Sequence, residues 1–186
     1  MIFAWELAGF FFIPIFGTLA HFIYDWTNHH KTAAIFFAVN ESTWENMKLA
    51  IGPSFLWLII EALWLTSYDN FIFAKMIALL LTCLLIPTIF YTYMAIVKKH
   101  ILAIDIFEFF FAIGCGQLAS YYILTSFSVP FIVNYMSFII LILIAIIYLT
   151  STFSPIKKFI FKDPRNMKYG LKAHMENEKH KLTKTK

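Results

Sequence analysis

Five long apolar segments limit the folds that this chain can adopt. They run over about residues 2–26, 43–65, 71–97, 101–126 and 131–152. About 20 consecutive apolar residues in a helix are enough to cross the hydrocarbon core of a bilayer. The sequence therefore predicts an all-α integral membrane bundle of five transmembrane helices.

Composition supports a lipid environment rather than water. Hydrophobic residues make up 60% of the chain and charged residues 14%, whereas soluble domains have about 45–50% apolar and about 25% charged residues. A chain of 186 residues has room for one helical bundle and no separate soluble domain. We expect a transmembrane domain over residues 1–153 and a basic tail over residues 154–186, whose last residues, 181–186, are expected to be disordered.

The cysteines and the net charge exclude some functions. Cys83 and Cys115 both lie in apolar segments, which is typical of small buried residues and not of a disulfide framework or a metal knuckle. The positive net charge of +4 comes from the tail, because the rest of the chain has more acidic than basic residues, so we expect no nucleic-acid partner. The first segment has neither a basic leader nor a small-residue cleavage site, and we expect it to stay as an anchor.

The densest polar run is Asn40–Lys48, between the first two long segments. Glu41 and Glu45 are four residues apart, so a helix would place them on one face. Ser42 followed by Glu45 matches a capping box, which predicts that the second long helix begins inside this run. The apolar stretch before it, residues 32–39, is too short to cross a bilayer and predicts a re-entrant or interfacial loop on the cytoplasmic side.

The lysines predict the orientation of the bundle. The tail, the turn at Lys98-Lys99 and the loop that holds Lys31 and Lys48 all fall on one side of five spans. The opposite turns, near residues 69 and 128, carry no Lys or Arg. The positive-inside rule then places the tail in the cytoplasm and the N-terminus outside, in a bacterial inner membrane. The expected partners are the lipid bilayer and anionic lipid headgroups at the tail; the oligomeric state stays open.

Polar residues inside the spans fall into two layers, estimated from a rise of about 1.5 Å per residue. Ionisable groups at such depths are costly and are therefore functional candidates. The cytoplasmic layer contains His21, Asp25, Glu41, Glu45, Asp105 and Glu108. The outer layer contains Glu6, Glu61, Gln117 and Asn134.

The cytoplasmic layer has two interpretations. In the first, all six residues are candidate ligands of a divalent metal, and His21, Asp25, Glu41 and Glu45 are the catalytic candidates of a membrane-embedded hydrolase. In the second, which we favour, the layer is a structural or binding network. Glu45 then caps a helix, His21 bonds Asp25 or a backbone carbonyl, and Asp105 and Glu108 pair with Lys98, Lys99 or Lys48.

Glu61 lies within an apolar helix, distant along the sequence from the charged clusters. One interpretation is a protonated side chain packed by Trp57 and Trp64. The other is a proton relay or cation site in a small carrier, with Glu6, Gln117 and Asn134 as further pathway candidates. The chain shows no internal repeat, which counts mildly against a carrier.

Three stretches, Gly17–Trp26, Asn40–Lys48 and Asp163–Gly170, resemble the motifs of a family of small multi-spanning bacterial membrane proteins. The similarity covers most of the chain, and the family has no characterised activity. Relatives often carry His at the position of Asn46. If that His binds a metal, its replacement by Asn counts against a metal site here. The Phe-, Ile- and Lys-rich composition suits a bacterium with a low-GC genome.

Overall fold

The structure is a computed structural model that describes residues 1–175; the expected disorder of residues 181–186 lies outside this range. Its long helices are α1 (Ile2–Trp26), α3 (Thr43–Leu65), α4 (Phe71–Val97), α5 (Leu102–Ser126) and α6 (Phe131–Thr150). A short helix α2 (Lys31–Phe36) and a 3-10 turn η1 (Phe159–Phe161) complete the described part of the chain. All 5 long helices are long and apolar enough to cross a membrane, which confirms the predicted all-α bundle.

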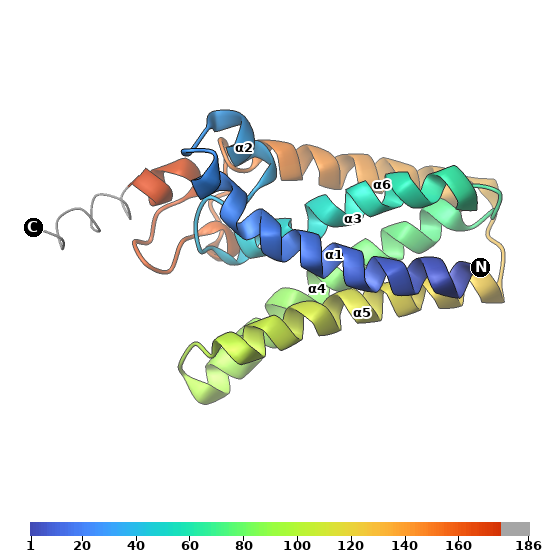
Figure 1. The fold of residues 1–186 in the computed structure, drawn as a ribbon, viewed down its shortest axis with the longest axis horizontal. Helices are drawn as coiled ribbons and strands as arrows, with labels where there is room; N and C mark the ends of the chain where they lie inside the picture. Colours follow the sequence, from blue (N-terminus) through green and yellow to red (C-terminus); the bar gives the residue numbers. More distant parts are fainter. Residues whose placement is uncertain (176–186) are drawn as a thin grey trace, which may run out of the picture.

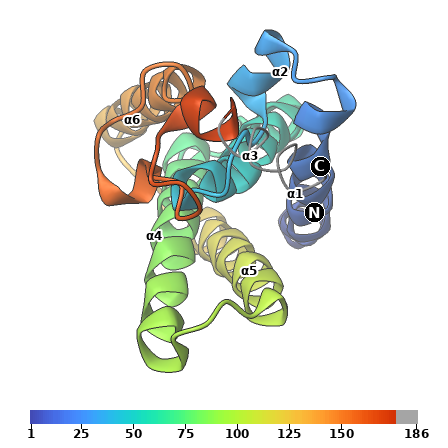
Figure 2. The same ribbon diagram turned by 90° about the vertical axis from the view of Figure 1, so that its left-hand side faces the viewer.

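The long helices lie side by side along the length of the molecule (Figure 1). In the end view, α3 lies in the middle, α6 and α1 lie on either side of it, and α4 and α5 lie below (Figure 2). Helix α4 contacts α3, α5 and α6, and α1 contacts α3 and α5. The first residue and the described end of the chain lie at opposite ends of the bundle (Figure 1).

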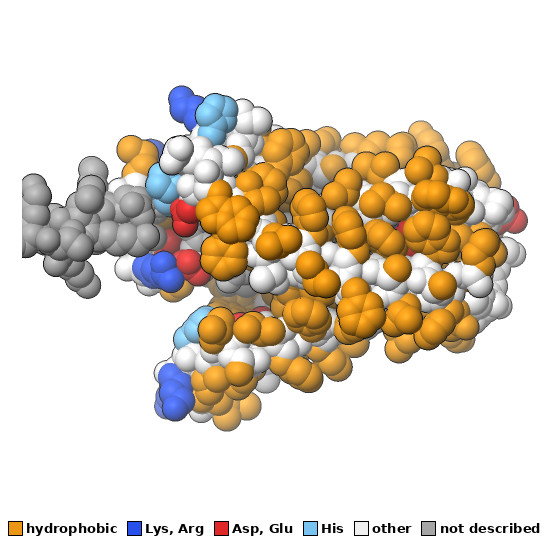
Figure 3. All heavy atoms as spheres, viewed as in Figure 1, with side chains coloured by type: hydrophobic (Ala, Val, Ile, Leu, Met, Phe, Trp, Pro, Cys, Tyr) orange, Lys and Arg blue, Asp and Glu red, His pale blue; other side chains and the backbone are white. Residues whose placement is uncertain are grey.

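The outer surface of the bundle is apolar. Large hydrophobic side chains are exposed along α6, among them Phe138, Leu143 and Ile146, and Figure 3 shows hydrophobic side chains over the whole length of the visible face. A soluble protein rarely exposes a continuous apolar surface of this extent. The arrangement is that of a membrane-embedded protein whose helices contact lipid.

Two glycines allow neighbouring helices to approach closely. A Cβ atom on Gly17 of α1 would lie 2.4 Å from the carbonyl oxygen of Leu49 on α3, and one on Gly116 of α5 would lie 2.7 Å from the carbonyl oxygen of Ala78 on α4. Small residues at such crossings permit tight backbone packing in membranes. These contacts hold α1 close to α3 and α5 close to α4.

One end of the bundle is covered by α2 and by the segment after α6 (Figure 1). Although that segment is expected from sequence to be part of a basic tail, Phe161, Asp163 and Ala173 are buried. The amide of Asn40 donates to the carbonyl oxygen of Gly170 at 3.1 Å. Residues 151–175 therefore pack against the bundle end instead of extending into solvent.

Candidate functional site

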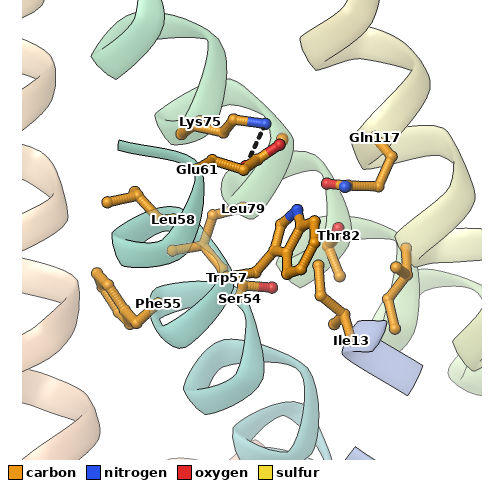
Figure 4. Close-up of a pocket in the computed structure, with 12 residues that line it drawn as sticks. Ile13, Ser54, Phe55, Trp57, Leu58, Glu61, Lys75, Leu79, Thr82 and Gln117 are labelled. Atoms are coloured by element: carbon orange, nitrogen blue, oxygen red, sulfur yellow. Dashed lines mark ion pairs between the residues drawn. The ribbon is translucent and has the colours of Figure 1, made fainter. Parts of the chain in front are cut away.

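An ion cluster joins three helices near the N-terminal end of the bundle. The ammonium nitrogen of Lys75 on α4 lies 2.6 Å from Oε1 of Glu6 on α1 and 2.6 Å from Oε2 of Glu61 on α3. All three side chains are buried. Figure 4 shows Lys75 and Glu61 pointing toward each other from adjacent helices.

Helix α5 supplies neutral partners to the same cluster. The hydroxyl of Ser120 donates to Oε1 of Glu6 at 2.7 Å, and the amide of Gln117 donates to the backbone carbonyl oxygen of Glu6 at 3.3 Å. Oε1 of Glu6 thus accepts from both Ser120 and Lys75. The cluster therefore connects α1, α3, α4 and α5.

The cluster has more acidic than basic side chains. Two carboxylates share one ammonium, and neither Oε1 of Glu61 nor Oε2 of Glu6 has a hydrogen-bond partner among residues 1–175. The indole nitrogen of Trp57 is a neighbour of the Glu61 carboxylate but makes no hydrogen bond of normal geometry among these residues. With every group ionised, the cluster has an excess negative charge, which is costly in a buried site unless it is paired.

A small cavity adjoins Glu61 and Trp57 on α3. It measures about 20 Å³ and is lined by Glu61, Lys75, Trp57 and Gln117, with apolar side chains around them. That volume holds about one water molecule. In Figure 4, the side chains of Trp57 and Gln117 converge on this space from different helices. The cluster is thus chemically suited to take up a proton or a small cation.

Of the four residues in the predicted outer layer, three meet in one site and Asn134 does not. Glu6, Glu61 and Gln117 come together as described above. Asn134 instead has its Oδ1 atom 3.0 Å from the backbone nitrogen of Phe73, from which it accepts a hydrogen bond. Since Phe73 is in the first turn of α4, Asn134 satisfies a backbone donor that has no partner within the helix.

A second buried ion pair lies at the opposite end of the bundle. The ammonium of Lys48 lies 3.1 Å from Oε2 of Glu45, and both side chains are at most 2% exposed. Lys48 also donates to the carbonyl oxygens of Ala34 and Phe37, each at 3.2 Å, and to the hydroxyl of Thr152 at 2.6 Å. Every proton of this ammonium has an acceptor, so the pair joins α2, α3 and the end of α6.

The start of α3 confirms half of the predicted capping box. The hydroxyl of Ser42 accepts from the backbone nitrogen of Glu45 at 3.3 Å. The carboxylate of Glu45 accepts from the backbone nitrogen of Val39 at 3.1 Å, whereas the backbone nitrogen of Ser42 donates to the side chain of Asn40. Glu45 therefore fixes the loop before α3 and pairs with Lys48 at the same time.

The remaining residues of the cytoplasmic layer have separate partners. Oε1 of Glu41 lies 3.3 Å from the guanidinium of Arg165. Asp25 pairs with His29 at 3.1 Å at an exposed position, and the ring of His21 packs edge-to-face on Phe22. Neither His21 nor Asp25 shares a hydrogen bond or ion pair with the two glutamates in the described structure.

The lysine partners expected for Asp105 and Glu108 are wrong. Asp105 accepts a hydrogen bond from the hydroxyl of Tyr93 and pairs with His100 at 2.9 Å. Glu108 is 4% exposed, and its Oε2 atom has no partner within residues 1–175. Lys48 is not available to either residue, because its ammonium is bound by Glu45 and Thr152 at the end of α6.

The described residues contain no group of three or more His, Cys, Asp or Glu side chains placed to hold a metal ion. Four of the six candidate ligands of the cytoplasmic layer, Asp25, Glu41, Glu45 and Asp105, are instead in four separate ion pairs. A metal site in this protein stays a prediction.

Sequence reasoning missed Lys75 and Ser120 as members of the outer cluster. A signal for Lys75 was present, since a lysine inside an apolar helix needs an acceptor at its own depth. Ser120 gave no such signal, because serine is common at helix contacts in membranes.

Comparison with known proteins gives one match. The model of a family of unknown function (DUF6512) matches residues 2–171. No curated protein and no solved structure matches the chain.

Proposed function

This chain belongs to the family of unknown function DUF6512, and we propose that it is a small membrane carrier coupled to a proton or a small cation. The binding site is the cluster of Glu6, Glu61 and Lys75, and Glu61 is the residue that gains and loses the proton or cation. The supporting observation is that two buried carboxylates share one ammonium, and that Oε1 of Glu61 has no hydrogen-bond partner among residues 1–175 and belongs to a residue that lines a cavity.

A purely structural role would need only one of the two carboxylates. The pair of Glu45 and Lys48 illustrates such a role, because it has equal numbers of charges and its polar atoms are engaged by neighbouring groups. The outer cluster has an additional carboxylate instead, and a buried uncompensated charge costs on the order of 3–5 kcal/mol. We assign the structural function of the polar network to Glu45 and Lys48, and ion coupling to Glu61.

The proposed location is a bacterial inner membrane, with the tail in the cytoplasm and the N-terminus outside. Support comes from the distribution of basic residues, since α2, the turn near residue 98 and the C-terminal segment lie at the same end of the bundle (Figure 1). Lys98 and Lys99 at this turn and Arg165 in the C-terminal segment contribute positive charge there. The positive-inside rule places such an end in the cytoplasm.

The decisive experiment is an ion-flux assay with the purified protein in liposomes that contain a pH-sensitive dye. An imposed proton, sodium or potassium gradient is expected to produce dye signals that depend on the protein. Glu61→Gln keeps the size of the side chain and removes its charge, and it is expected to abolish the flux while the unfolding temperature in detergent stays close to that of the unchanged protein.

Asp69→Asn is the matched control, because Asp69 is exposed in the turn between α3 and α4. It is expected to leave the flux unchanged. Unchanged flux in Glu61→Gln, or no flux by the unchanged protein under any of the three gradients, would refute the proposal.

The metal-dependent hydrolase remains the alternative proposal. It requires stoichiometric metal on the purified protein, which elemental analysis measures directly. It also requires that Glu41 or His21 variants lose that metal. Glu41 pairs with Arg165 and His21 packs on Phe22. Because the structure shows no contact between Glu41 and His21, it favours ion coupling over this alternative.

A further inference from the structure

A deep cleft opens at the end of the bundle opposite the ion cluster. It has a volume of about 560 Å³ and lies between the ends of α3, α4 and α5 and the segment after α6. Figure 3 shows the surface hollowed at this end, with acidic, basic and histidine side chains on both sides of the hollow. Binding pockets for small molecules have volumes of about 300–1,000 Å³, so this cleft is large enough for a ligand.

The walls of the cleft are mainly apolar. Ile86, Phe90 and Met94 line it from α4, and Phe159 and Met167 line it from the C-terminal segment. The same end of α4 and α5 has strongly exposed apolar residues on its outside, including Ile96 and Leu102. An apolar chain that leaves the cleft would therefore continue along a lipid-facing surface.

Glu108 supplies an unused acceptor inside the cleft. Its side chain lines the cleft and is 4% exposed, and Oε2 has no partner among the described residues. Burying a carboxylate oxygen without a partner is costly. A ligand that donates a hydrogen bond to Oε2 of Glu108 would remove this cost, and a cationic donor would make the strongest bond.

Two basic side chains stand on the C-terminal segment at the same cleft. Lys162 has no side-chain hydrogen bond or ion pair within residues 1–175, and Arg165 uses only part of its donor capacity on Glu41, at 3.3 Å. A guanidinium has five N–H donors and an ammonium three. Both groups are suited to a phosphate.

We propose that this cleft binds a phospholipid whose headgroup contains both a phosphate and a primary ammonium. The ammonium donates to Glu108, Lys162 and Arg165 bind the phosphate, and an acyl chain lies along Phe90 and Met94. The charges of the lining support a zwitterion over an anion, because Glu41 and Glu108 balance Lys162 and Arg165. This proposal is independent of ion coupling at Glu61.

The test uses the full-length protein in phosphatidylcholine nanodiscs and native mass spectrometry. Short-chain phosphatidylethanolamine, phosphatidylcholine and phosphatidylglycerol are compared as probes. Phosphatidylcholine keeps the phosphate but has no N–H donor, and phosphatidylglycerol lacks the cation. We expect phosphatidylethanolamine to bind about tenfold more tightly than either, as one charge-assisted hydrogen bond implies.

Variants then locate the site. Glu108→Gln is expected to erase the preference for phosphatidylethanolamine over phosphatidylcholine, and Lys162→Gln to weaken binding of all three lipids. The matched controls are Asp69→Asn at the opposite end and Lys157→Gln, both exposed positions outside the cleft lining, and neither is expected to alter binding.

Glycerophosphoethanolamine, the headgroup without acyl chains, separates a lipid site from a site for a soluble phosphate compound. It is expected to bind much more weakly than the lipid, because it cannot use the apolar walls. Equal binding of the three lipids, a preference that survives in Glu108→Gln, or equally tight binding of the free headgroup would each overturn the proposal.

Discussion

Lys75 and Glu61 lie at matching depths on either side of the turn that joins α3 to α4. Glu61 is four residues before the last residue of α3, Leu65, and Lys75 is four residues after the first residue of α4, Phe71. Their charged atoms lie 2.6 Å apart. The two antiparallel helices thus place Glu61 and Lys75 at the same depth, about one turn from the helix ends, and the facing of their side chains completes the ion pair.

Replacing Lys75 with Met is expected to destabilise the protein by about 3–5 kcal/mol, because it leaves the carboxylates of Glu6 and Glu61 buried without a cation. The double variant Lys75→Met/Glu61→Gln should recover part of this loss, since one of the two carboxylates is then neutral. The measurement is reversible unfolding in mixed detergent micelles. Equal stability of Lys75→Met and the unchanged protein would show that the cluster is not charged in the folded state.

The pair of Glu45 and Lys48 gives a contrasting prediction. Lys48→Met is expected to cost about 3–5 kcal/mol and to loosen the contact with Thr152 at the end of α6. Limited proteolysis should then cut the segment after α6 faster than in the unchanged protein. Lys157→Met, at an exposed position on that segment, is the control and should leave the cleavage rate as it is.

The double variant Glu45→Gln/Lys48→Met, compared with the two single variants, measures how strongly Glu45 and Lys48 stabilise the protein through each other. A coupling energy of about 1 kcal/mol or more between the two changes is expected for residues in direct contact. Additive effects would mean that Lys48 acts through the backbone carbonyls of Ala34 and Phe37 and not through Glu45.

The bundle itself was predictable from the sequence because hydropathy and length decide which segments cross a membrane. The meeting of Glu6, Glu61 and Gln117 followed from depth along the helices. Asn134 shows the limit of that argument, since equal depth does not determine which neighbour a side chain faces. In the structure it satisfies the backbone of Phe73 and does not join the ion cluster.

Contacts of the C-terminal segment were not predictable from the sequence. Asn40 bonds the carbonyl oxygen of Gly170 across 130 positions of the chain, and no periodic pattern signals such a contact. The same holds for Lys48 and Thr152. The sequence predicted a basic tail from residue 154, and nothing in that composition indicated that Phe161 packs on Trp44.

Replacing glycine with alanine is expected to destabilise the protein more at Gly17 than at Gly114. Gly17→Ala should be strongly destabilising, because the new Cβ would lie 2.4 Å from the backbone oxygen of Leu49 and a backbone cannot move aside. Gly114→Ala is the matched comparison, since its Cβ would approach only the ring of Phe10, at 3.1 Å. We expect a clearly lower unfolding temperature for the first variant than for the second. The reverse order would contradict the helix packing described here.

Gly170 is expected to control whether the C-terminal segment stays docked. Its φ of +53° is in the left-handed region, and a Cβ there would lie 2.3 Å from the carbonyl oxygen of Thr152. The backbone conformation alone costs an alanine about 1–2 kcal/mol, and the clash adds to that. Gly170→Ala should therefore release the segment.

Release of the segment has two measurable consequences. Proteolysis after α6 should become faster, and the cleft should lose lipid binding, because Lys162 and Arg165 are part of the released segment. Lys172→Ala, an exposed change two residues further on, should have neither effect. If Gly170→Ala resists protease as the unchanged protein does, the segment is held by its other contacts, such as Phe161 on Trp44. If the segment is released while lipid binding persists, the phosphate contacts proposed for Lys162 and Arg165 are wrong.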